Sequence, residues 1–160
     1  MGTRGFFGFY YKGKYYLVYN HYDSYPQWLG KTIVKELKAA IDNNRLDEWK
    51  SKLDNIKVVT DKTPPTSEEI ELLKKYSNTS VSRQTAYDWY CLLHKCQGSL
   101  EDVLESGYLY SLGNTPQECW SSWTEYGYVV NLDSDTLDYY SDPSTHVPTS
   151  YKYDTLPDWS

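Results

Sequence analysis

Strand-forming residues dominate the start of the chain. Residues 3–11 (TRGFFGFYY) and 14–22 (KYYLVYNHY) are rich in aromatic and β-branched side chains and flank a short turn, KGK. Two such runs around a Gly-containing turn predict a β-hairpin. A two-residue turn would place Arg4 opposite His21, whereas a three-residue turn would place Gly5 there.

Helical periodicity follows at once. An apolar residue recurs every three or four positions between Pro26 and about Asn43, which predicts an amphipathic helix. The stripe consists of Leu29, Ile33, Val34, Leu37 and Ile41. Asp23 or Ser24 is a suitable N-cap for this helix, and Pro26 fits its first turn.

The middle of the chain continues with shorter helices. We expect one at 46–55, one opened by a Thr66–Glu69 capping box, one from Ser82 to about Cys96, and one capped by Ser99 and Asp102 that ends at Gly107. The segment IKVV (56–59) fits either a short strand or a connection.

The last part of the chain returns to strand patterns. Residues 125–141 (EYGYVVNLDSDTLDYYS) predict two strands joined at the DSD turn. Residues 142–160 contain three prolines and predict an extended strap that is packed down by its aromatic residues. We therefore expect a single α+β domain over residues 1–160. Its N- and C-terminal hairpins should share one antiparallel sheet, packed against a helical middle.

Charge and hydropathy restrict the partners. The formal net charge of −6 argues against a surface that coats a nucleic-acid polymer. No stretch approaches the length of a membrane span, and no apolar segment opens the chain, so we expect a cytoplasmic protein without membrane contact. The sequence leaves both a monomer and a homo-oligomer open.

Cysteine and histidine positions show no metal-site spacing. Cys91, Cys96 and Cys119 are odd in number, and no second Cys/His pair completes a zinc pattern. We expect buried free thiols, no metal and no cofactor. His94 and His146 show neither triad nor metal spacing, and we expect structural roles for both.

The joint between the hairpin and the first long helix carries the candidate chemistry. Arg4, His21 and Asp23 would meet at the open end of the hairpin, where the helix also begins. Arg, His and the N–H groups of a helix N-terminus together form an anion site, most naturally for phosphate. In an enzyme, Asp23 would orient His21 as the general acid or base.

Aromatic residues beside this joint extend the hypothesis. Tyr25 and Trp28 could stack a base or ribose, and Thr3 lies next to Arg4. The chain holds 18 Tyr and 6 Trp against 3 Phe, so polar-tipped aromatic side chains should line its core and clefts. The opposing interpretation is structural. Asp23 would then only cap the helix, and Arg4 would only form an ion pair with Asp23.

A family resemblance rests on the opening MGTRGFFGFYYKGKYYLVYNHYDSYPQWLG. It resembles small proteins of phages, large DNA viruses, bacteria and fungi that begin with a TRG or TRS strand and an H-x-D-x-Y-P-x-x-x-G joint. The matching residues are Thr3, Arg4, His21, Asp23, Tyr25, Pro26 and Gly30, whereas Tyr22 and Ser24 replace the usual Trp and Gly. The segments EYGYVVNLDSDTLDYY and YKYDTLPDW also match, but the helical middle does not. The resemblance implies no activity; its phage members suggest counter-defence, by sequestering or cleaving a nucleotide signal.

Three function classes follow. The first is a protein that binds, and as an enzyme would hydrolyse, a small phosphate-bearing or nucleotide-type ligand. The second is an amide hydrolase of the N-terminal-nucleophile type, which needs cleavage after Gly2 to free the amine of Thr3. The third is a structural or interaction protein with an aromatic-rich surface and no small ligand.

Overall fold

A five-stranded sheet forms the centre of the protein, with strand order β2-β1-β5-β6-β7. The computed structural model describes residues 3–81, 87–111, 113–120, 124–141 and 147–159. The strands are β1 (Gly5–Tyr11), β2 (Lys14–Asn20), β5 (Tyr126–Asn131), β6 (Thr136–Tyr140) and β7 (Thr149–Lys152). Strands near both ends of the chain therefore share one sheet, and the predicted α+β class is confirmed.

The N-terminal hairpin has the two-residue turn. Tyr11 pairs with Lys14, and Phe6 pairs with Tyr19. Lys12 and Gly13 both have positive φ values, of 50° and 74°, as the right-handed twist of a tight hairpin favours. Their backbone N–H groups donate to the Asp133 carboxylate at 2.9 and 3.0 Å, which ties this turn to the β5–β6 turn.

The sheet is mixed, which corrects the expectation of a purely antiparallel one. β1 and β5 run parallel, with Phe7 beside Tyr128 and Phe9 beside Val130. The helical middle is long enough to return the chain to the end of the sheet where β1 started. The hydropathy pattern does not distinguish parallel from antiparallel pairing, because aromatic and branched side chains can pack beside each other in either arrangement.

Helices occupy the middle of the chain. They are α1 (Lys31–Asp42), α2 (Leu46–Asn55), α3 (Ser67–Leu72), α4 (Trp89–Leu92), α5 (Leu100–Ser106) and α6 (Pro116–Trp120), with a π-helix η1 (Pro26–Gly30) before α1 and short 3₁₀ turns η2 (Lys74–Tyr76), η3 (Thr79–Val81), η4 (His94–Cys96) and η5 (Tyr153–Thr155). The helix at 46–55 and the Thr66–Glu69 capping box are confirmed. Ser99 caps α5, which ends at Gly107 in the left-handed region.

Of the predicted helix from Ser82 to Cys96, the described residues contain only the short helix α4 and the 3₁₀ turn η4. α4 begins only after Asp88, whose carboxylate accepts from the Cys91 N–H at 2.8 Å, and it ends at Leu92. A 3₁₀ turn, η4, follows it. Asp88 is suited to this position because its short carboxylate satisfies a free N–H group of the first turn. Residues 82–86 lie outside the described part of the chain.

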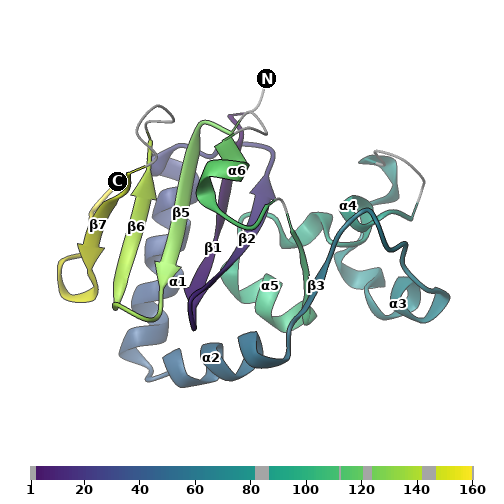
Figure 1. Cartoon of the computed structure of the whole chain (residues 1–160), viewed down its shortest axis with the longest axis horizontal. Helices are drawn as coiled ribbons and strands as arrows, with labels where there is room; N and C mark the ends of the chain where they lie inside the picture. The colour runs from purple at the N-terminus through teal and green to yellow at the C-terminus, as the bar shows by residue number, and fades with distance from the viewer. Residues whose placement is uncertain (1–2, 82–86, 112, 121–123, 142–146, 160) are drawn as a thin grey trace.

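Neither β4 (Tyr108–Tyr110) nor α6 was predicted. β4 pairs in parallel with β3 (Lys57–Val59), so the IKVV segment is a strand in a second, two-stranded sheet. α6 lies on the opposite face of the main sheet from α1 (Figure 1). Both are only three to five residues long, too short for a periodicity signal.

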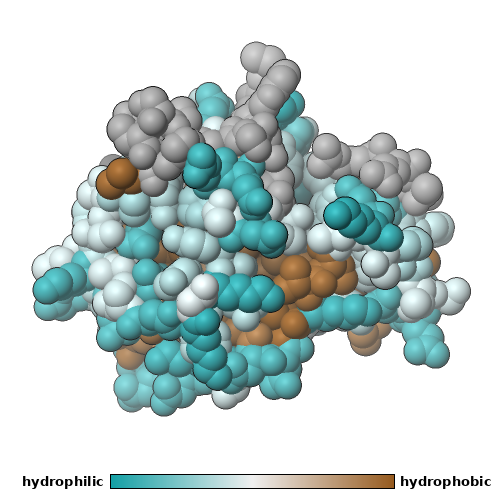
Figure 2. All heavy atoms as spheres, in the orientation of Figure 1, coloured by the Kyte–Doolittle hydropathy of each residue, from teal (hydrophilic) through white to brown (hydrophobic). Residues whose placement is uncertain are grey.

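Side chains on both faces of the central strands are buried. Phe7, Phe9 and Val130 face the helices of the larger core, whereas Phe6 and Val129 belong to a smaller cluster with Cys119. Burial on both faces explains why β1 is almost continuously aromatic instead of alternating. In contrast, the face shown in Figure 2 is mostly hydrophilic, with its largest hydrophobic area near the middle.

The C-terminal tail packs against the fold, as predicted, but it contains a strand. β7 pairs with β6 at the edge of the sheet. Beyond it, the Trp159 ring contacts Tyr139, with ring centroids 5.0 Å apart. A Cβ atom on Gly30 would lie 2.6 Å from the Trp159 ring, so only glycine permits this contact. Residues 142–146, which include His146, lie outside the described segments.

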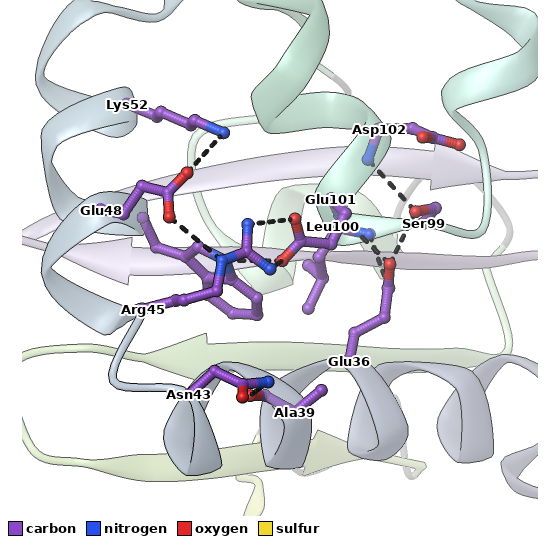
Figure 3. A network of polar contacts seen from close by, with 11 residues as sticks. Glu36, Ala39, Asn43, Arg45, Glu48, Lys52, Ser99, Leu100, Glu101 and Asp102 are labelled. Atoms are coloured by element: carbon purple, nitrogen blue, oxygen red, sulfur yellow. Dashed lines mark hydrogen bonds and ion pairs between the residues drawn. The ribbon is translucent and has the colours of Figure 1, made fainter.

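A polar network joins α1, α2 and α5 (Figure 3). The Glu36 carboxylate accepts from the Ser99 hydroxyl at 2.7 Å and from the Leu100 N–H at 2.9 Å. Burial raises the pKa of the Glu36 carboxyl, and these donors oppose that shift. Arg45 forms a two-pronged pair with Glu101 at 2.9 and 3.1 Å. The network thus fixes the start of α5, directly after η4.

All three cysteines are buried free thiols, as predicted. Burial raises the pKa of Cys96 and of Cys119 to about 12, so both stay protonated. Within the described residues, no helix has the length and apolar content needed to cross a membrane.

The Lys57–Glu69 pair predicts a pH-dependent stability. The Lys57 ammonium lies 2.7 Å from the Glu69 carboxylate and lowers the Glu69 pKa to about 2. A carboxylate whose pKa is lowered by folding stabilises the folded state at pH values above its ordinary pKa. This contribution disappears as the pH falls toward 2. We expect Glu69→Gln to cost about 1 kcal/mol at pH 7, because Lys57 is partly solvated, and much less near pH 2.5.

Urea unfolding at pH 7, 4 and 2.5 measures this difference, with exposed Glu71→Gln on the same helix as control. A wild-type advantage over Glu69→Gln that stays constant down to pH 2.5 would contradict the assignment.

Candidate ligand-binding cleft

Buried hydrogen bonds hold the joint between the hairpin and η1. Ser24 is fully buried, and its N–H donates to the Thr3 carbonyl at 3.1 Å. The Asn20 amide donates to the Tyr22 carbonyl at 2.6 Å and to the Ser24 hydroxyl at 2.9 Å. The Tyr128 hydroxyl donates to the Ser24 carbonyl at 2.7 Å. This corner is therefore a rigid, internally satisfied turn.

The predicted anion site at the helix N-terminus does not form as expected. Tyr25, rather than Asp23 or Ser24, is the N-cap of η1, and no side chain caps it. The Trp28 and Gly30 N–H groups donate to the Tyr25 carbonyl. The Leu29 N–H donates to the Asp23 carbonyl at 3.1 Å. The Trp28 N–H group, which an ordinary helix start would offer to an anion, is thus already engaged within η1.

The predicted residues separate. Arg4 is exposed, and its side chain forms no hydrogen bond or ion pair within the described residues. The His21 Nδ1 atom and the Tyr19 hydroxyl form a 2.6 Å hydrogen bond. Thr3 is buried in the corner, and the Tyr25 ring lies against Tyr126, with centroids 5.8 Å apart.

Asp23 and Trp28, in contrast, line one cleft of about 320 Å³. Its walls come from the joint, from the start of α1 and from the segment around η4. The lining residues are Asn20, Tyr22, Asp23, Trp28, Leu29, Thr32, His94, Gln97 and Gly98. The cleft therefore lies on the joint that the sequence indicates, but much of its wall comes from residues distant in sequence.

Two exposed aromatic side chains stand at this cleft. Tyr22 is 60% exposed and Trp28 is 63% exposed. The His21 ring contacts Tyr22 edge-on, with ring centroids 4.4 Å apart, and so supports it from one side. Exposed aromatic rings beside polar groups are typical of sites that stack planar ligands.

His94, for which the sequence predicts a structural role, lines this cleft. Its Nδ1 atom is buried and has no hydrogen-bond partner within the described part of the chain. The Tyr90 ring packs against it, with centroids 5.4 Å apart. Burial lowers the pKa of His94, so the imidazole is neutral at pH 7. No local motif marks His94, because its cleft partners lie some seventy positions earlier.

Gln97 connects the two walls. Its side-chain oxygen accepts from the His21 N–H at 2.9 Å, so His21 acts here through its backbone. Since the oxygen is engaged, the Gln97 amide N–H₂ group is the part of this side chain available to a ligand. Gly98, with φ of 88°, lets the chain turn away beside Asn20.

Unusual backbone geometry concentrates at the same place. Asp23 has a φ of 55°, and η1 is a π-helix, an element that is rare and often found at functional sites. None of the described lining residues is Lys or Arg, and Asp23 forms no ion pair with a described residue. Nor do the described segments gather three His, Cys, Asp or Glu side chains that could hold a metal ion.

Comparisons with known proteins found no matching family model, no matching curated protein and no matching solved structure. The resemblance through the TRG strand and the H-x-D-x-Y-P-x-x-x-G joint stays a prediction, and the function has to be argued from the cleft itself.

Proposed function

We propose that this cleft binds a nucleoside-type small molecule, such as a nucleotide, through its base and ribose. The observation that carries the proposal is the pairing of two exposed aromatic side chains, Tyr22 and Trp28, with the polar side chains of Asp23, His94 and Gln97 in one cleft. The volume of about 320 Å³ lies in the range of small-molecule sites.

Each lining group has a role in this proposal. Trp28 stacks on the base, and Tyr22 covers it from the rim. The His94 imidazole and the Gln97 amide N–H₂ group together contact a base edge. The Asp23 carboxylate accepts from ribose hydroxyl groups.

This proposal differs from the anion site expected from the sequence. Arg4 does not line the cleft, and the cleft contains no other Arg or Lys among its described residues. A phosphate would therefore extend toward solvent and add little affinity. A binder of this kind would suit sequestration of a nucleotide signal, the role that the resemblance to phage proteins suggests.

The Thr3 amide hydrolase and the interaction protein stay predictions. Thr3 is buried, and its carbonyl accepts from Ser24, so no observation favours Thr3 as a nucleophile. In the enzymatic version, His94 replaces His21 as the candidate base beside Asp23, because both line the cleft. Mass spectrometry of the nucleotide after incubation separates hydrolysis from binding.

Calorimetric titration with the four ribonucleoside 5′-monophosphates tests the proposal. We expect at least one of these nucleotides to bind the wild-type protein. Trp28→Ala should lower its affinity by about tenfold or more, because base stacking contributes about 1–3 kcal/mol. His94→Leu, which removes the imidazole from the cleft wall, should weaken binding of the same nucleotide.

Tyr87→Ala is the matched control, because Tyr87 is an exposed aromatic residue that does not line this cleft. Ribose 5-phosphate, which lacks the base, should not bind. Equal affinities for wild type and Trp28→Ala, or binding of ribose 5-phosphate as tight as that of the nucleotides, would overturn the proposal.

A further inference from the structure

A second concave surface lies between α1 and the C-terminal tail. It is a groove of about 410 Å³, and its residues differ from those of the cleft. The lining residues are Lys31, Val34, Lys35, Lys38, Ala39 and Asp42 on α1, and Pro157, Asp158 and Trp159 on the tail. The groove combines an apolar floor with charged rims.

The tail wall of this groove is held in place. The Trp159 ring rests on Gly30 and contacts Tyr128 and Tyr139, with centroids 5.6 and 5.0 Å apart. Tyr151 packs edge-on against the same ring at 6.0 Å. Because these contacts anchor the tail beside α1, the groove exists without a partner.

Positive charge gathers on the helix wall. Lys31, Lys35 and Lys38 are exposed and recur at the spacing of one helix face, which makes a row about 10 Å long. Their side chains form no hydrogen bond or ion pair with a described residue. In a chain of net charge −6, three lysines in a row along one groove form a local concentration of positive charge.

We propose that this groove binds an acidic amphipathic peptide segment of a partner protein. Apolar side chains of the segment would contact Val34, Ala39 and Trp159, and its carboxylates would pair with the lysine row. Asp42 and Asp158 also line the groove, so carboxylates of the segment are favoured only along the lysines.

Charge and shape favour a peptide over other anionic partners. The net charge of −6 repels a nucleic-acid polymer beyond the short lysine row. A bilayer offers a broad surface that cannot enter a groove, whereas a helix or an extended segment can.

Fluorescence anisotropy with a labelled peptide tests this proposal. The probe is a synthetic peptide of leucine and glutamate, about 14 residues long, with leucine every third or fourth position. We expect wild type to bind it with an affinity that falls with salt, and Lys35→Glu/Lys38→Glu to weaken binding by about tenfold or more.

Lys62→Glu/Lys74→Glu is the matched control, because it changes the net charge equally at exposed lysines outside the groove. A second peptide with every glutamate replaced by glutamine should bind wild type weakly, which tests the charge without altering the protein. No binding by wild type, or equal weakening by the two double variants, would overturn the proposal. So would a lysine-dependent response to single-stranded DNA or to anionic vesicles in place of the peptide.

Discussion

Replacing Trp49 by alanine is expected to lower the free energy of unfolding by about 3–5 kcal/mol, the largest effect of any change proposed for this protein. Trp49 is fully buried between α2 and the sheet, and its ring meets Phe9 edge-on, with centroids 5.7 Å apart. Its indole N–H donates to the Glu101 carboxylate at 2.8 Å. The substitution would leave a cavity and remove a donor from a carboxylate that also holds Arg45.

Urea unfolding followed by circular dichroism measures this effect. Trp28→Ala serves as the matched control, because the same substitution at an exposed tryptophan should change stability by less than about 0.5 kcal/mol. The stability loss of Trp49→Phe should lie between the losses of Trp49→Ala and Trp28→Ala. A Trp49→Ala variant as stable as Trp28→Ala would show that Trp49 does not hold α2 on the sheet.

The second large effect is expected at Glu36, where alanine should cost about 2–3 kcal/mol. The substitution would leave the Ser99 hydroxyl and the N–H groups of Leu100 and Glu101 without their acceptor (Figure 3). Because Ser99 directly follows the cleft residues Gln97 and Gly98, the loss should also loosen that wall.

Hydrogen exchange tests both parts of this prediction. In Glu36→Ala, amides of residues 94–102 should exchange faster than in wild type, whereas Glu36→Gln, which keeps an acceptor oxygen, should show a smaller change. Glu71→Ala, at an exposed glutamate, should leave exchange in this segment unaltered. Unchanged protection of residues 94–102 in Glu36→Ala would refute the proposed link between the network and the cleft.

Local signals in the sequence predict much of the fold. The hairpin turn, the helix at 46–55 and the capping box at Thr66 each depend on neighbouring residues, and the structure contains all three. The parallel β1–β5 pair depends instead on how a long connection returns across the sheet, which no local pattern encodes. In the predicted fourth helix, the structure places an N-cap at the internal residue Asp88, a boundary that the periodicity did not indicate.

The candidate site shows the same division. Sequence reasoning located the joint, and Asp23 and Trp28 do line a cleft. It did not find His94 or Gln97, which reach the cleft through the placement of η4 beside β2. The sequence also predicted that Arg4 and His21 would lie beside Asp23. However, strand pairing fixes the positions of facing residues only within the strands, and the paired region ends at Gly5 and Asn20. The chain then turns through Asp23, which has a positive φ.

The most direct test of nucleoside binding at this cleft is a ¹H–¹⁵N NMR titration of the wild-type protein with adenosine 5′-monophosphate and the three other ribonucleoside 5′-monophosphates. If the cleft binds nucleosides, we expect saturable shifts for at least one nucleotide at the Trp28 indole N–H, at the Gln97 side-chain amide and at the backbone amides around Asp23 and His94. Spectra that stay unchanged with all four, or shifts confined to residues outside the cleft, would contradict nucleoside binding there.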